Sequence, residues 1–154
     1  MRGLVLAVLL VCMVFSCAIA EEETPVDLDL TFMNGNMLYA QVWQMMETPD
    51  EYTGAIIRVA GKFSYFQDPD TGKEYFAALI PDAAACCAQG MEFIWEGEHV
   101  YPEDYPELGK DILVTGRFET YEENGYLYIQ LADAELIWTE EQSQGKLLSY
   151  GKQS

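Results

Sequence analysis

The chain has few basic residues, a single histidine and none of the common catalytic motifs. Eight Lys and Arg stand against 26 Asp and Glu in 154 residues, which gives a formal net charge of −18. Because Lys and Arg supply most of a protein's affinity for phosphate backbones, this charge predicts that nucleic acid is not a partner. A Gly-rich phosphate loop, a Gly-x-Ser-x-Gly elbow, a Cys-x-x-Cys pair and a His-Glu-x-x-His helix are all absent from the sequence. These absences favour a protein that is not an enzyme.

The composition is nevertheless that of a folded protein. Half of the residues are apolar and 13% are aromatic, which is enough to offset the entropy lost when a chain orders. The length of 154 residues suits one compact domain. We therefore expect a single hydrophobic core.

The N-terminus carries an apolar stretch that is too short to span a bilayer. Arg2 is the only charged residue before Glu21, and residues 4–15 are apolar. Residues 18–20, Ala-Ile-Ala, are the small side chains that signal peptidase accepts before a cleavage site. We expect residues 1–20 to be a signal peptide, so the protein is exported to the cell envelope or secreted. The alternative is a lipoprotein whose lipid, on Cys17, anchors it to a membrane.

Removal of the signal peptide would change both the charge and the cysteine content. Seven basic and 26 acidic residues would remain, a net charge of −19, together with two adjacent cysteines. The acidic residues 21–33 are expected to form an extended leader, and residues 34–138 the folded domain. Residues 139–154 are polar and are expected to form a flexible tail.

Residue periodicity predicts one helix followed by strands. Apolar side chains recur at helical spacing from Asn34 or Asn36 until Thr48-Pro49 ends the run. The period then changes to two, and turn-forming residues separate the apolar runs. The five strands are expected at residues 57–65, 75–80, 91–95, 111–121 and 126–138.

The first and fourth expected strands share a pattern of glycine and apolar residues. Gly54, Ile57, Val59, Gly61 and Phe63 recur 55 positions later as Gly109, Ile112, Val114, Gly116 and Phe118. A glycine inside a strand predicts a bend that lets the strand pair with two neighbours in a small closed barrel. Over residues 53–138 the pattern resembles an oligonucleotide/oligosaccharide-binding (OB) barrel. The expected fold is mainly β, a small five-stranded OB-like barrel with one N-terminal α-helix; the alternative is an open sheet.

Cys86 and Cys87 are adjacent and directly follow the second expected strand. Buried inert thiols, a vicinal disulfide and ligands of a metal all remain open for this pair. Zinc or another soft divalent metal would require further ligands, and His99, in the acidic loop after the third strand, is the candidate. The alternative for His99 is a solvated side chain. Metal or redox handling in the envelope is therefore the alternative function.

A Cys-Cys pair flanked by Ala and Asp, just after a strand of an OB-like domain, is similar to one in uncharacterised bacterial envelope proteins. Those proteins are associated with a proposed membrane permease complex. The likeness is confined to the neighbourhood of Cys86 and Cys87. It implies an envelope location and an accessory role.

Four tyrosines lie around the two expected hairpins: Tyr65, Tyr75, Tyr126 and Tyr128. On an OB barrel such side chains can form a surface on which a ligand stacks, whereas cross-strand aromatic pairs are the structural alternative. Together the patterns predict an exported, non-catalytic binding or accessory module. Its expected partner is a protein or a small polar ligand, not nucleic acid, and any contact with a membrane would be through a lipid on Cys17.

Overall fold

The computed structural model describes residues 25–82, 84 and 87–138. The expected signal peptide with Cys17, the residue Cys86 and the expected tail lie outside these residues. Within the described part of the chain, no helix combines the length and the apolarity needed to cross a membrane.

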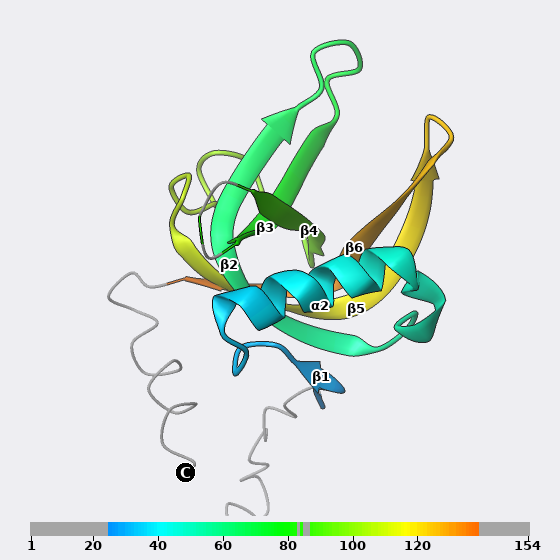
Figure 1. Ribbon diagram of the computed structural model, residues 1–154. Helices are drawn as coiled ribbons and strands as arrows, with labels where there is room; N and C mark the ends of the chain where they lie inside the picture. Colours follow the sequence, from blue (N-terminus) through cyan, green and yellow to red (C-terminus); the bar gives the residue numbers. More distant parts are fainter. Residues whose placement is uncertain (1–24, 83, 85–86, 139–154) are drawn as a thin grey trace, which may run out of the picture.

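Five strands close into a ring, as Figure 1 shows. They are β2 (Ile56–Gln67), β3 (Glu74–Pro81), β4 (Ala88–Trp95), β5 (Asp111–Glu123) and β6 (Tyr126–Trp138). The order is β2-β3-β4-β6-β5, and β5 pairs back with β2. The β4–β6 pairing is parallel and the others in the ring are antiparallel. The predicted fold class, a mainly β five-stranded OB-like barrel, is confirmed.

Strand β2 pairs with two neighbours in turn and bends at Gly61 between them. Residues 56–62 pair with β5, and residues 62–67 pair with β3. A Cβ atom on Gly61 would lie 2.9 Å from the backbone oxygen of Leu79 and 3.0 Å from the Cβ of Ala78. Only glycine therefore allows β3 to approach this closely.

The second copy of the repeat behaves in the same way. A Cβ atom on Gly116 would lie 2.9 Å from the backbone oxygen of Ala132, and the pairing of β5 with β6 shifts register at this point. Both copies also begin at a glycine with a left-handed φ, +87° at Gly54 and +79° at Gly109. The repeat thus marks the two strands that bend to close the barrel, and the open-sheet alternative is wrong.

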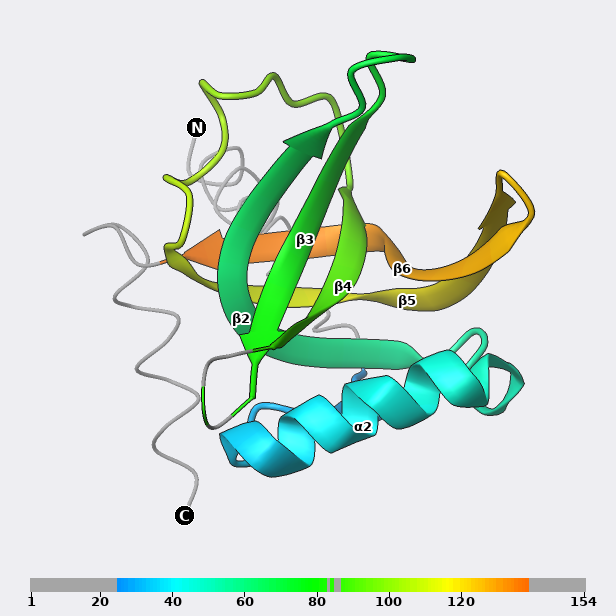
Figure 2. The same cartoon turned by 45° about the horizontal axis from the view of Figure 1, so that its top comes forward.

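Helix α2 (Gly35–Glu47) lies across one end of the barrel, below β3 and β4 in Figure 2. Asn34 begins it, because its side chain accepts a hydrogen bond from the N–H of Met37 at 3.1 Å. The buried face consists of Leu38, Val42 and Met45. The predicted N-terminal helix is confirmed, and the short 3₁₀ helix η1 (Pro49–Glu51) follows it.

Strand β1 (Leu28–Asp29) adds a sixth strand by pairing in parallel with β2. The sequence-based expectation of a leader outside the domain is therefore corrected for these residues. Leu30 is fully buried, and Asp27 accepts a hydrogen bond from the N–H of Ile56 at 2.8 Å. The alternation of apolar and polar residues is too short here to indicate a strand without the neighbour that it pairs with.

Candidate functional site

A cleft opens where the pairing of β3 with β4 stops. The two strands are paired as far as Ala77 and Glu92. Beyond this point residues 74–76 stay with β2, whereas residues 93–95 stay with β6. A cleft of about 420 Å³ lies there, and the β2–β3 and β5–β6 hairpins rise on either side of it (Figure 1). Its volume is within the range of small-ligand sites.

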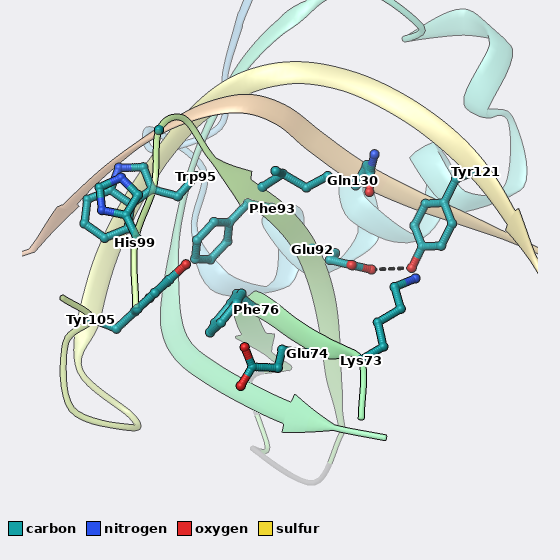
Figure 3. Close-up of a pocket in the computed structure, with 12 residues that line it drawn as sticks. Lys73, Glu74, Phe76, Glu92, Phe93, Trp95, His99, Tyr105, Tyr121 and Gln130 are labelled. Carbon is teal, nitrogen blue, oxygen red and sulfur yellow. Dashed lines mark hydrogen bonds between the residues drawn. The ribbon is translucent and has the colours of Figure 1, made fainter. Parts of the chain in front are cut away.

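Aromatic, carboxylate and amide side chains and one lysine line this cleft (Figure 3). The lining residues are Lys73, Glu74, Phe76, Glu92, Phe93, Ile94, Trp95, Gly97, His99, Tyr105, Tyr121 and Gln130. They come from β3, β4, β5, β6 and the loops that follow β2 and β4. Apolar rings with a few polar groups are the usual lining of a ligand site.

The aromatic half of the cleft consists of rings held in contact with each other. The rings of Trp95 and His99 are parallel, with centroids 3.4 Å apart, and Phe76 and Tyr105 stack at 4.3 Å. The Nε2 atom of His99 lies 2.9 Å from the backbone oxygen of Glu96, and because a carbonyl oxygen only accepts, the ring nitrogen is the donor of this hydrogen bond. These contacts fix the rings before any ligand arrives.

The polar half of the cleft centres on Glu92. The hydroxyl of Tyr121 donates a hydrogen bond of 2.6 Å to Glu92 Oε2. Burial raises the pKa of the Glu92 carboxyl above its ordinary value, and the hydrogen bond from Tyr121 only partly offsets this. Burial, followed by the hydrogen bond to Glu92, raises the pKa of Tyr121. The carboxyl group of Glu92 thus lies in a part of the cleft that is less hydrated than the protein surface.

A polar clasp of Lys73, Tyr75 and Glu123 joins the tips of the two hairpins. Lys73 Nζ lies 2.8 Å from Glu123 Oε1, and the Tyr75 hydroxyl donates to Glu123 Oε2 at 2.7 Å. Lys73 Nζ also lies 4.5 Å from the centre of the Tyr75 ring and 5.1 Å from that of Tyr121. The hydrogen bond from Lys73 lowers the pKa of Glu123, so the clasp is charged at neutral pH.

None of the four tyrosines predicted to bind a ligand is among the lining residues of the cleft. Tyr65 stacks on Tyr101 at 3.9 Å and donates to Glu74, which raises its pKa to about 12. Tyr75 belongs to the clasp, Tyr128 stacks at 5.3 Å on the lining residue Tyr121, and Tyr126 is exposed. Their role as a stacking surface stays a prediction.

Sequence reasoning missed three of the rings that line the cleft. Phe93 and Trp95 lie in the expected strand at residues 91–95, and Tyr105 lies in a loop without a pattern, so the sequence does not mark them as site residues. Beyond Ala77 strands β3 and β4 no longer pair, and this opens the cleft beside these rings. The sequence does not indicate where the pairing ends. The run of aromatic residues on neighbouring strands was the available hint.

Cys87 and His99 lie beyond opposite ends of β4. Eight strand residues separate them, a span of roughly 25 Å at the usual rise per residue. The structure therefore does not bring His99, the candidate further metal ligand, beside Cys87, because β4 runs between them. Among the residues described, no group of three His, Cys, Asp or Glu side chains is placed to hold a metal. Cys86 lies outside them, so a disulfide with Cys87, or zinc on the pair, stays a prediction.

The closed ring of strands and the cleft at its β3–β4 opening define an OB-type barrel. No family model matches the chain, and no curated protein matches it. A solved structure that it resembles is the N-terminal domain of PriB from Thermoanaerobacter tencongensis, described as dimeric. The two share 14% identity over 55% of this chain and 97% of that one, with a TM-score of 0.30.

The predicted exclusion of nucleic acid is corrected. The closed barrel itself stands against this exclusion, because OB barrels bind oligonucleotides as well as oligosaccharides. The physical error was to apply the net charge of the whole chain to one surface, whereas a partner meets only the local side chains. At a TM-score of 0.30 the likeness identifies no ligand for this protein.

Proposed function

We propose that this protein is an OB-type binding domain that holds a chain-like ligand in the cleft between the β2–β3 and β5–β6 hairpins, without chemical conversion. The observation that carries the proposal is the lining: stacked rings on one side, and Glu92 with its Tyr121 partner on the other. The cleft also lies at the strands and hairpin loops through which OB barrels bind chain molecules. Peptide, sugar and single-stranded nucleic acid are all candidates.

Export to the envelope is part of this proposal. Its support is the sequence of residues 1–20, with an apolar stretch followed by Ala-Ile-Ala. Residues Cys86 and Cys87 support an accessory role through their resemblance to envelope proteins. A binding domain placed there would meet its ligand outside the cytoplasm.

Titration calorimetry of the purified protein with three probes tests the proposal. The probes are an alternating lysine–threonine peptide, a linear chito-oligosaccharide and an oligothymidylate. We expect at least one to bind, and we expect His99→Ala and Gln130→Ala to weaken it, because both side chains line the cleft. Loss of a ring or of a hydrogen-bonding amide would cost roughly tenfold in affinity.

Leu108→Ala is the matched control, because this exposed residue lies in the same loop as His99 but does not line the cleft. Leu108→Ala should bind the probe with the same affinity as the unaltered protein. The proposal fails if no probe binds, or if the control weakens binding as much as His99→Ala does.

A further inference from the structure

One edge of β3 faces the cleft, and no strand of the described chain lies beside it there. Residues 74–76 pair with β2 on one side, while the ladder to β4 on the other side ends at Ala77. Residues 126–129 of β6, across the cleft, pair with β5 but not with β4. Such an edge presents backbone N–H and C=O groups that an extended chain can pair with.

The charges around this edge favour a basic partner. Glu74 and Glu92 line the cleft, whereas the lysine that lines it, Lys73, is already bonded to Glu123. A cationic side chain entering the cleft would therefore be attracted by the carboxylates of Glu74 and Glu92.

The clasp shows what the cleft offers to such a side chain. The ammonium group of Lys73 lies over the rings of Tyr75 and Tyr121 while it bonds to Glu123. Rings beside a carboxylate, as in this arrangement, attract cations. The lining of the cleft has the same two components as the clasp, a carboxylate and aromatic rings: they are Glu92, Trp95 and Tyr105.

We infer that the ligand is an extended basic peptide segment that adds a strand to residues 74–76 of β3 and places a Lys or Arg side chain against Glu92. This inference rests on the proposed function, because it names the ligand of the same cleft. Backbone pairing would supply affinity, and the carboxylate with its neighbouring rings would supply the preference for a basic residue.

The test uses the lysine–threonine peptide in three forms, measured by fluorescence polarisation at physiological salt. One form is unmodified, and the other two carry N-methyl groups on alternate residues in opposite registers. Because an added strand turns only every second N–H toward its neighbour, one methylated form should lose binding and the other should keep it. A peptide with glutamate in place of lysine should not bind.

Glu92→Gln and Glu122→Gln are the matched variants of the protein. Both remove one negative charge, but Glu122 is an exposed residue of β5 that does not line the cleft. We expect about tenfold weaker binding of the unmodified peptide to Glu92→Gln, as for a lost charged hydrogen bond, and less than about twofold weaker binding to Glu122→Gln. Thermal unfolding of each variant shows that it is folded.

The outcomes separate this inference from the proposed function. Equal binding of both methylated forms, or equal weakening by the two glutamine variants, overturns strand addition at this edge. Binding of the oligosaccharide or the oligothymidylate alone, lost in His99→Ala, keeps the proposed function and overturns the peptide. If no probe binds in a cleft-dependent way, both fail.

Discussion

Replacement of Gly61 by alanine should destabilise the barrel, because the bend in β2 leaves no room for a side chain. The added Cβ would lie 2.9 Å from the backbone oxygen of Leu79 and 3.0 Å from the Cβ of Ala78. The first contact is with backbone, so β3 would have to move away from β2 at the point where the barrel closes. Overpacking of this kind costs about 1–3 kcal/mol.

A smaller effect of the opposite sign acts on the unfolded chain. Alanine has less backbone freedom than glycine in the unfolded chain, and this stabilises the folded state by about 0.4–1 kcal/mol. The net loss for Gly61→Ala is therefore about 1–2 kcal/mol. For a domain of this size it should lower the melting temperature by roughly 4–8 °C.

Urea denaturation and thermal unfolding followed by circular dichroism measure this loss. Gly35→Ala is the control, because Gly35 lies in the first turn of α2 and a Cβ added there would meet no atom within 4 Å. It should leave the stability unchanged or slightly raised. If Gly61→Ala were as stable as Gly35→Ala, the steric explanation of the repeated glycine would be refuted.

Three further predictions concern the last hairpin, Glu92 and the N-terminus. Gly125→Ala should cost about 1 kcal/mol in urea denaturation through backbone strain alone, because its φ is +82° and no atom crowds it. Burial raises the pKa of Glu92 in the folded state, so ionisation of this carboxyl opposes folding as the pH rises through that pKa. The free energy of unfolding of Glu92→Gln should therefore rise relative to that of the unaltered protein as the pH is raised from about 4. A difference that stays constant with pH would contradict this. The intact mass of the protein from its native host should correspond to a chain that starts at Glu21, whereas a lipid mass on Cys17 would establish the lipoprotein route.

The sequence predicted the elements whose causes are local. Asn34 begins the helix through its own side chain. Asn124 and Gly125 turn the last hairpin through left-handed φ values of 52° and 82°. The glycine repeat predicted the two bent strands, and with them the closed barrel, because the same steric demand arises twice in one chain.

The tertiary structure alone decided the site. Lys73 and Glu123 are 50 positions apart and meet only because the two hairpins rise side by side. The cleft exists because β3 and β4 part beyond Ala77 and Glu92, and that depends on the partners each strand already has. A net charge or a run of aromatic residues belongs to the sequence, but which side chains face one ligand together is fixed by contacts between segments that are distant along the chain.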